Sequence, residues 1–275
     1  KINEEEITIL SGSFYHRNKG IEFQDAHHFY SADIDLFGHG SFFQYINRTT
    51  ISEGTMKLAD ALKVNDISNI KLRQEAVKEL SSKPKWRQHY AGTSSLVSVE
   101  TSAKNIITWL LEHKPFLPRI MRWIPLSFGI VSIMILGLTI FNMIDQSWIG
   151  YWLLVGLVVT GIYLKKINNL ATNCDKVKET FRQYASLLNQ IENETFVSEE
   201  LQKKQNQIKS NGKKASVIFK EFSKSLDALD NRNNLISAIF GNGLFLLDVQ
   251  NSFKVEKWIS EHANKVSDWF EVVSF

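Results

Sequence analysis

The chain has 275 residues, of which 44% are hydrophobic and 22% charged, and this composition excludes a wholly disordered protein. A single cysteine, Cys174, excludes an intramolecular disulfide and a multi-cysteine zinc site. The net charge of +3 is too small to indicate nucleic-acid binding by itself. The length is compatible with one domain or with two.

The first stretch, residues 1–40, predicts an irregular N-terminal segment. It opens with the acidic run Glu4 to Glu6 and continues as a polar, aromatic-rich sequence with scattered glycines. Because this sequence has no helical period and many turn-forming residues, we expect loops with short extended pieces.

Helical periodicity begins near Ser41 and continues over the segment 41–118. Ser52 is a predicted N-cap of one helix, and Asp66 or Ser68 is a predicted N-cap of the next. The sequence Ser81-Ser82-Lys83-Pro84 predicts where that second helix ends, because the residue before a proline disfavours the α conformation.

The segment 119–166 contains two apolar runs. Residues 123–144 and residues 148–164 carry no charge. Only Asp145-Gln146-Ser147 separates the two runs, and these three residues are too few for anything but a tight turn. At about 1.5 Å per residue the first run is long enough to cross ~30 Å of hydrocarbon, and the second is near the lower limit of roughly 17 residues. The pattern predicts a transmembrane helical hairpin, and the alternative is a soluble hairpin buried in a large core.

The residues that flank this hairpin predict its orientation. Arg119 and Arg122 precede it and Lys165 and Lys166 follow it, whereas the connecting loop has no cation. By the positive-inside rule both termini are then cytoplasmic, in a two-pass protein of the inner (cytoplasmic) membrane. The lipid bilayer is therefore an expected partner.

The remaining segment, 167–275, repeats apolar residues at helical spacing almost throughout, and strand signals are scarce. We therefore predict an all-α fold: an irregular segment, a first set of core helices, the membrane hairpin, and a set of returning helices.

Signals for chemistry in this chain are weak. The histidines around His27 and His28 lack the spacing of a metal site, and no P-loop frame occurs, so no catalytic, cofactor-binding or metal-ligating residue is predicted. An enzyme that uses the histidine-rich loop is an alternative that loss of activity on His27→Ala would support. Cys174 is interpreted as a small core residue, or as a juxtamembrane palmitoylation site.

A basic cluster in the returning helices is the candidate site for DNA phosphates or anionic headgroups. The alternative is a solvated helix face, since glutamates are interleaved with the cluster. The candidate DNA-binding residues are Lys203, Lys204, Lys209, Lys213 and Lys214.

The sequence from Asp33 to Leu80 resembles the core, or lever, domain of MutS-type DNA mismatch repair proteins. The resemblance lies in Ser41-Phe42-Phe43, in Ile46-Asn47-Arg48-Thr49-Thr50, and in the helix Arg73 to Leu80. The residues Asp230 to Asn234 and the helix from Trp258 to Trp269 are similar to the returning helices of that family. The family-motif residues, which we expect to be structural, are Asn47, Arg48, Thr49, Gly54 and Arg73.

This resemblance implies a non-catalytic, membrane-anchored lever. Only about thirty residues precede the motif, so the mismatch-reading domain of the family has no room there, and the membrane hairpin stands where the family inserts its DNA clamp. The ATPase domain, with its ATP and Mg²⁺, is expected downstream of Phe275, and with it the homodimer interface. The alternative is a membrane-tethered scaffold that binds another protein without DNA or nucleotide.

Overall fold

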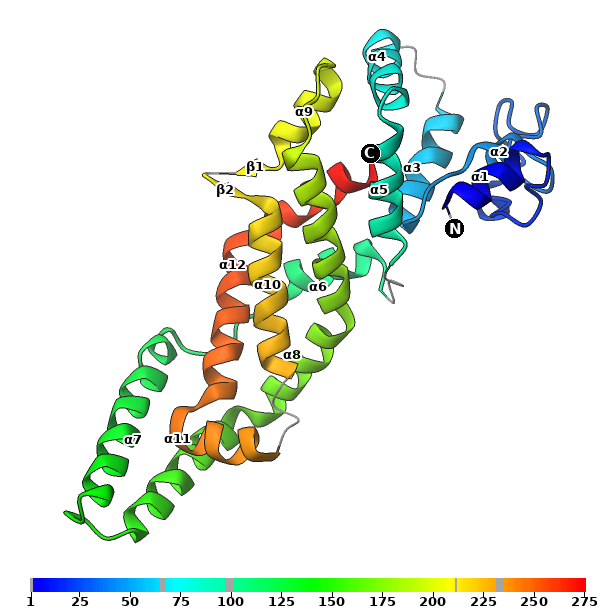
Figure 1. The fold of residues 1–275 in the computed structure, drawn as a ribbon. Helices are drawn as coiled ribbons and strands as arrows, with labels where there is room; N and C mark the ends of the chain where they lie inside the picture. The colour runs from blue at the N-terminus through cyan, green and yellow to red at the C-terminus, as the bar shows by residue number, and fades with distance from the viewer. Residues whose placement is uncertain (1, 65–67, 97–100, 211, 231–234) are drawn as a thin grey trace. The chain divides into compact units, whose positions relative to one another are not determined.

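A computed structural model describes residues 2–64, 68–96, 101–210, 212–230 and 235–275 (Figure 1). Helices make up most of these residues, and the strands among them, β1 (Lys209–Ser210) and β2 (Lys213–Lys214), form one antiparallel pair. The predicted all-α class is therefore confirmed for the described part of the chain.

The helices before the apolar region are short. They are α1 (Ile2–Leu10), the 3-10 helix η1 (Ile21–Phe23), α2 (Phe42–Ile46), α3 (Ser52–Lys63), α4 (Ile70–Ser81), α5 (Pro84–Ser94), α6 (Ala103–Glu112) and the 3-10 helix η2 (Arg119–Arg122).

The later helices include the longest of the described chain. They are α7 (Ile124–Ile140), α8 (Ser147–Asn193), α9 (Glu199–Gln207), α10 (Ala215–Asp230), the π-helix η4 (Ser237–Gly241), α11 (Asn242–Phe245) and α12 (Leu247–Ser274).

The chain divides into two compact units, each made from separate stretches of sequence. The first takes residues 1–98, 183–216 and 268–275, and the second takes residues 99–182 and 217–267. Each unit therefore combines residues of the predicted first core part, 41–118, with residues of the predicted returning helices, 167–275.

Several helix boundaries follow local capping signals. The Ser41 side chain accepts a hydrogen bond from the backbone N–H of Gln44, which confirms the predicted helix start near Ser41. Helix α3 begins at Ser52 itself, so the N-cap is Ile51, one residue earlier than predicted. Helix α4 begins after Asn69 rather than Ser68 and ends at Ser81 as predicted; Asp66 lies outside the described residues.

The N-terminal segment is less irregular than predicted, because its first residues form helix α1. The acidic residues Glu4 and Glu5 lie in the first turn, where negative charge is favourable beside unpaired backbone N–H groups. From Ser11 to Gly40 the backbone forms the predicted loops and turns, but a short helix, η1, stands where short extended pieces were expected. The aromatic residues Phe23, Phe37 and Phe43 gather there into a small core.

Aromatic contacts also join distant segments of the first unit. The rings of Tyr184 on α8 and Phe270 on α12 lie 4.3 Å apart, centroid to centroid. The hydroxyl of Tyr90 on α5 donates to the carbonyl oxygen of Val273 at 2.7 Å. Because both tyrosines are largely buried, burial raises their pKa above the ordinary value and they remain neutral donors.

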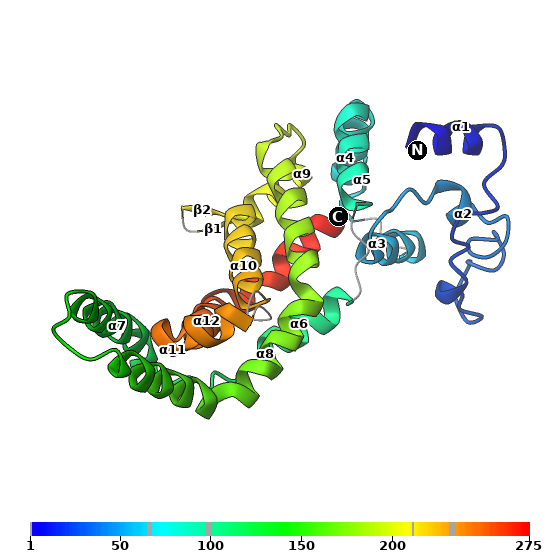
Figure 2. The same cartoon turned by 60° about the horizontal axis from the view of Figure 1, so that its bottom comes forward.

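The second unit has a core where α8, α10 and α12 run side by side (Figure 2). The Trp258 indole on α12 stacks on Phe222 of α10 with ring centroids 3.7 Å apart, and its N–H donates to the carbonyl of Ile218 at 3.1 Å. Phe181 of α8 meets the Trp258 and Phe222 rings edge-on. Cys174 is buried in α8 and its pKa is raised by burial, so it is a core residue rather than a poised nucleophile.

The two apolar runs form helices of unequal length. The second run begins α8, which has 47 residues and is the one described helix long and apolar enough to cross a membrane by length and composition. The first run forms α7, which has 17 residues and ends at Ile140 rather than near Ile144. It ends there because Asn142, with φ 54, takes the left-handed conformation that closes the helix. The prediction of two helices of spanning length is therefore met by α8 alone.

The helix that carries part of the family motif caps a returning helix within the first unit. Glu79 on α4 accepts the backbone N–H groups of Val197 at 2.9 Å and of Ser198 at 2.7 Å, just before α9 begins. Burial alone would raise the pKa of Glu79, but these hydrogen bonds and Lys83 outweigh burial and lower it. Glu79 thus acts as an N-cap supplied by another helix.

We predict that Glu79→Ala destabilises the first unit by about 0.5–2 kcal/mol, the usual cost of a lost N-cap. Amide hydrogen exchange measured by mass spectrometry should rise in residues 197–207. Because the pKa of Glu79 is lowered, its contribution is complete above the ordinary value of 4.5 and is lost as the pH falls through the lower folded value. The control is Glu75→Ala, an exposed carboxylate on the same helix; equal exchange in the two variants would refute the cap.

Candidate functional site

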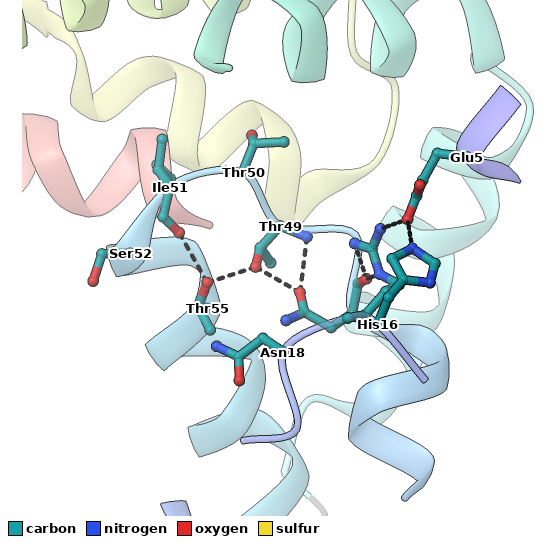
Figure 3. Close-up of a pocket in the computed structure, with 10 residues that line it drawn as sticks. Glu5, His16, Asn18, Thr49, Thr50, Ile51, Ser52 and Thr55 are labelled. Carbon is teal, nitrogen blue, oxygen red and sulfur yellow. Dashed lines mark hydrogen bonds and ion pairs between the residues drawn. The ribbon is translucent and has the colours of Figure 1, made fainter. Parts of the chain in front are cut away.

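The predicted motif residue Asn47 lies at the end of α2 and is buried, with 4% of its surface exposed. Its side-chain oxygen accepts the backbone N–H of Thr49 at 2.9 Å and the Thr49 hydroxyl at 2.6 Å. The Thr49 hydroxyl also contacts that of Thr55, on α3, at 2.7 Å (Figure 3). Asn47 and Thr49 thus fix the turn that leads from α2 into α3.

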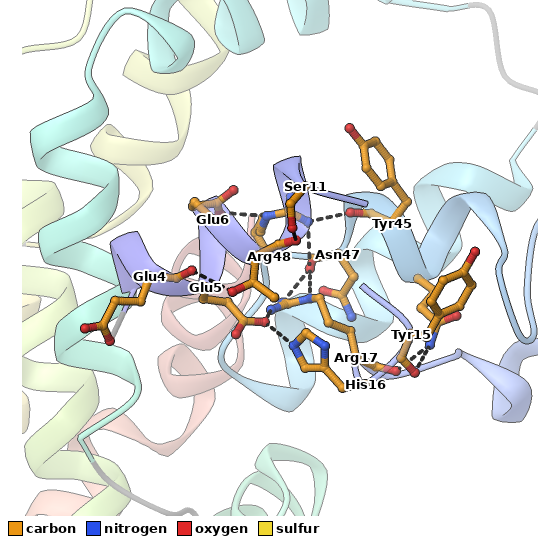
Figure 4. A network of polar contacts seen from close by, with 12 residues as sticks. Glu4, Glu5, Glu6, Ser11, Tyr15, His16, Arg17, Tyr45, Asn47 and Arg48 are labelled. Atoms are coloured by element: carbon orange, nitrogen blue, oxygen red, sulfur yellow. Dashed lines mark hydrogen bonds and ion pairs between the residues drawn. The ribbon is translucent and has the colours of Figure 1, made fainter. Parts of the chain in front are cut away.

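Arg17, which the sequence analysis did not single out, completes this arrangement (Figure 4). Its guanidinium donates twice to the carbonyl oxygen of Asn47, at 3.0 and 2.6 Å, and once to the Glu5 carboxylate at 2.6 Å. His16 contacts the same carboxylate at 2.7 Å. These hydrogen bonds lower the pKa of Glu5 below its ordinary value, with His16 contributing most.

Arg48, the next residue, also reaches helix α1. Its Nε donates to Glu6 on α1 at 2.7 Å, and its Nη1 donates to the carbonyl of Tyr45 at 2.5 Å. A planar guanidinium suits this double role, because it presents its donors in a fixed fork. The acidic run of α1 therefore supplies the carboxylate partners of both arginines. The opposite charges of these two segments are the sequence signal that could have indicated this contact.

The two other motif residues have local roles. Gly54 is buried in the first turn of α3, where an added Cβ would lie 3.4 Å from Ile51 and 3.6 Å from Thr49, so the turn packs closely there. Arg73 belongs to α4 and donates to the carbonyl of Ser68 at 3.0 Å. The structure thus brings Asn47, Arg48, Thr49 and Gly54 together at the α2–α3 turn and places Arg73 on a separate helix.

An open cavity of about 390 Å³ lies beside this turn (Figure 3). The charged groups in its wall, Glu5, His16 and Arg17, are bonded to one another and to the backbone, so they support the turn. Its lining residues are Glu5, His16, Arg17, Asn18, Asn47, Thr49, Thr50, Ile51, Ser52 and Thr55.

The histidine-rich loop has a structural arrangement at His28. Its Nδ1 accepts the backbone N–H groups of Tyr30 and Ser31, so its Nε2 carries the proton and donates to the carbonyl of Lys63 at 3.0 Å. His27 is exposed. Among the described residues, no group of three or more His, Cys, Asp or Glu side chains is placed to hold a metal ion.

The candidate DNA-binding lysines lie on α9 and on the β1–β2 hairpin, an element that the sequence analysis did not predict. Lys209 and Lys214 face each other in the hairpin register, and Lys213 lies beside them. Lys209 and Lys214 donate to the side-chain oxygens of Asn206 and Asn193, at 3.1 and 2.8 Å. Since like charges opposite one another disfavour strand pairing, an anion at this hairpin would relieve a real repulsion.

The other two lysines differ from each other. Lys203 is exposed on α9. Lys204 is bonded to Glu271 at 3.0 Å and lies over the ring of Phe275, with its Nζ 4.9 Å from the ring centroid. Lys204 therefore holds the end of α12 in the first unit.

The second unit carries a large apolar surface on α7 and on the first part of α8. Only 11% of the most apolar stretch of α8 is buried. Among the described residues, this stretch of α8 is therefore not buried in a core of the chain. The strongly exposed apolar residues are Leu126, Ile130, Ile133, Met134 and Ile140 on α7, and Trp148, Tyr151, Leu154, Val158 and Ile162 on α8.

Helices α7 and α8 are packed against each other on their inner faces. The rings of Phe128 and Trp152 stack with centroids 4.4 Å apart, and the Trp152 indole N–H donates to the hydroxyl of Ser132 at 2.7 Å. At the open end of the pair, Lys166 lies over the ring of Phe116 at 5.9 Å. The cations that flank the two apolar runs are therefore at the same end.

Glu256 of α12 anchors the chain where it enters this region. Its carboxylate is 4% exposed and accepts the backbone N–H groups of Phe116 at 2.8 Å and Leu117 at 3.2 Å. His113 contacts it at 3.3 Å. A buried carboxylate held by three donors fixes the loop before η2 and α7.

No family model, no curated protein and no solved structure matches this chain. The MutS resemblance therefore remains a prediction from the motif residues. Of the residues that the resemblance adds, Asn231 to Asn234 lie outside the described part of the chain.

We predict that Asn47→Ala lowers the free energy of unfolding by about 1–3 kcal/mol, because the part-buried N–H and hydroxyl of Thr49 lose their acceptor. The measurement is chemical denaturation followed by circular dichroism. Asn206→Ala, at an exposed position of α9, is the control. Equal stability of the two variants would contradict the role assigned to Asn47.

Proposed function

We propose that this chain is the non-catalytic helical core of a membrane-anchored MutS-like protein, with α7 and the first part of α8 crossing the inner membrane. The observation that carries the anchor is the exposed apolar surface of α7 and α8, bounded at one end by Arg119, Arg122, Lys165 and Lys166. Monomeric soluble proteins rarely expose contiguous apolar patches of this extent to water. A bilayer stabilises such a surface because its hydrocarbon core removes the apolar side chains from water, where their exposure is unfavourable.

The two-pass topology rests on lengths and charges. Helix α7, with 17 residues, is about 25 Å long at 1.5 Å per residue, which is at the lower limit for a span. The loop to α8 holds one acid, Asp145, and no cation, whereas both outer flanks are cationic. The positive-inside rule then puts both termini of this chain in the cytoplasm.

The MutS-like assignment rests on the motif and on how it is used. Asn47, Arg48 and Thr49 organise a turn through buried hydrogen bonds, and Glu79 in the second motif helix caps α9. A non-catalytic lever requires such rigid connections rather than reactive groups. The apolar hairpin also belongs to a unit inserted between the stretches of the first unit, as the family inserts its clamp between lever helices.

On this proposal the lever couples a downstream ATPase domain, which would bind ATP and Mg²⁺ and form the homodimer, to DNA or to a protein partner. The cationic residues proposed to contact DNA are Lys203 and the hairpin lysines Lys209, Lys213 and Lys214. The pairing of Lys204 with Glu271 favours the second candidate, a membrane-tethered scaffold that binds a protein without DNA. Binding measurements on the lysine variants separate the two candidates.

The topology predicts which side chains a membrane-impermeant maleimide reaches in intact cells. Gln146→Cys, in the loop between α7 and α8, should be labelled without permeabilisation. Ser13→Cys should be labelled only after permeabilisation, because it lies on the cytoplasmic side. The unsubstituted protein is the control, since its buried Cys174 should stay unlabelled. Protection of Gln146→Cys in intact cells, together with its labelling after permeabilisation, would refute the two-pass arrangement.

The DNA proposal predicts a change in the salt dependence of binding. Replacing Lys209, Lys213 and Lys214 by Glu should weaken binding of duplex DNA and reduce the slope of log K against log salt by about 3, one unit per lost phosphate contact. Fluorescence anisotropy at several salt concentrations measures both quantities. The matched control replaces three exposed lysines elsewhere by Glu, namely Lys71, Lys85 and Lys176. Equal slopes for both triple variants would favour the protein-binding scaffold.

A further inference from the structure

Residues 235–247 form a second charge-free region in the second unit. The sequence Leu-Ile-Ser-Ala-Ile-Phe-Gly-Asn-Gly-Leu-Phe-Leu-Leu precedes Asp248 and contains η4 and α11. An apolar run of roughly 10–14 residues is too short to span a bilayer, and it is typical of a buried core helix or of a re-entrant or interfacial segment. The exposure of its side chains distinguishes these cases.

The outer face of this segment is apolar and exposed. Leu235 and Ile236 expose 72% and 69% of their surface, and Phe240 exposes 54%. Ile236 and Phe240 are four residues apart, so they lie on one face of the helical segment, and Leu235 adjoins them. A core helix would bury this face, which leaves the re-entrant or interfacial arrangement.

The inner face is docked on α8 and α7, and Figures 1 and 2 both show α11 beside these helices. A Cβ built on Gly156 of α8 would fall 2.3 Å from the carbonyl oxygen of Gly243, and one built on Gly243 would fall 2.5 Å from Leu153 Cγ. The two glycines thus permit direct backbone contact between α11 and α8. Small residues allow the same close approach between helices in membranes.

The depth of this contact follows from the residues that make it. Gly156 is the central residue of the charge-free run 148–164 on α8, and Ser132 is the central residue of α7. The Ser132 hydroxyl donates to the carbonyl of Leu244 at 2.5 Å. If α7 and α8 lie in the bilayer, α11 must therefore lie near its middle.

The backbone at this depth is satisfied within the protein. Between α11 and α12 the chain turns at Leu246, which has φ 52 and is fully buried. Asn242, itself 4% exposed, accepts the backbone N–H of Asp248 at 2.8 Å. Non-helical backbone is tolerated at membrane depth only where protein groups supply its hydrogen bonds, and this break meets that condition.

The exit from the membrane is consistent with the same depth. From Leu246, the first residues of α12 lead to Glu256, which binds the backbone of Leu117 next to the cationic flank. Ten residues of helix rise about 15 Å, which is half of a hydrocarbon core of about 30 Å. Along this stretch Asp248 is 6% exposed, so its charged side chain is turned into the protein.

From these contacts we propose that residues 235–246 form a re-entrant element that enters the bilayer beside α7 and α8, with Leu235, Ile236 and Phe240 against lipid acyl chains. This inference rests on the proposed membrane anchor, and it adds a third membrane element. Lipid is the occupant because the apolar face continues the lipid-facing surface of α7 and α8 and offers no charge to a polar partner.

The test places an environment-sensitive fluorophore on single cysteines in the full chain, reconstituted in phospholipid nanodiscs. The probed positions are Phe240→Cys, Ile133→Cys on the exposed face of α7, and Lys224→Cys on the polar surface of α10. Cys174 is buried and should not react, which labelling of the unsubstituted chain checks. Quenching is measured with nitroxide lipids labelled in the middle of the acyl chain and with aqueous iodide.

The proposal predicts that the Phe240 probe matches the Ile133 probe, with strong quenching by acyl-chain nitroxide and little by iodide. If the Phe240 probe instead matches the Lys224 probe while Ile133 remains lipid-quenched, the re-entrant element is refuted and the membrane anchor stands. If Ile133 and Phe240 both behave like Lys224, the anchor fails as well, and with it this inference.

A glycine variant tests the docking contact independently. Gly243→Ala would put a methyl group against Leu153, so the Phe240 probe should lose lipid quenching and gain iodide quenching while the Ile133 probe is unchanged. Gly137→Ala on α7 is the control, because an added Cβ there meets no atom within 4 Å. If quenching of the Phe240 probe is unchanged in Gly243→Ala, the contact between α11 and α8 at Gly243 does not determine how deep Phe240 lies in the bilayer.

Discussion

The packing of α7 on α8 through Phe128, Ser132 and Trp152 is the contact on which the second unit depends. It pairs the inner faces of two apolar helices and leaves their outer faces exposed. Ser132 then uses its hydroxyl twice, as acceptor from Trp152 and as donor to Leu244. One buried hydroxyl thereby connects α7, α8 and α11. Ser132 is fully buried, and a buried polar group without a hydrogen-bond partner carries a large free-energy cost.

The first unit relies on a different kind of interaction. Its α2–α3 turn is held by one buried amide, Asn47, and by two arginines that reach acids on α1. These groups satisfy one another's hydrogen-bonding capacity. The charged and polar residues that line the cavity beside the α2–α3 turn therefore stabilise the turn and are not arranged as a reactive centre. The motif residues Asn47, Arg48 and Thr49 are therefore structural residues of the α2–α3 turn.

Much of the secondary structure followed from local sequence, and the misses have physical reasons. Ser41 caps α2 through a bond to a residue three positions away, and α4 ends before Pro84, so sequence alone sufficed at both places. The helix α1 was missed because its stabilising partners, Arg17 and Arg48, lie outside the helix, 12 and 42 residues from the glutamates that they bind. The pairing of Lys204 with Glu271 was not predicted, since it joins residues on separate helices.

The sequence by itself determined that the chain is helical and that it contains two long apolar runs with cationic flanks, because helical period and charge-free length are local properties. Only the tertiary structure decided that α7 ends at Ile140, that Asn47 and Arg17 form one network, and that Gly243 rests on Gly156. These features depend on backbone conformation and on contacts between distant residues, and no local period encodes which distant glycine or carboxylate a residue will meet.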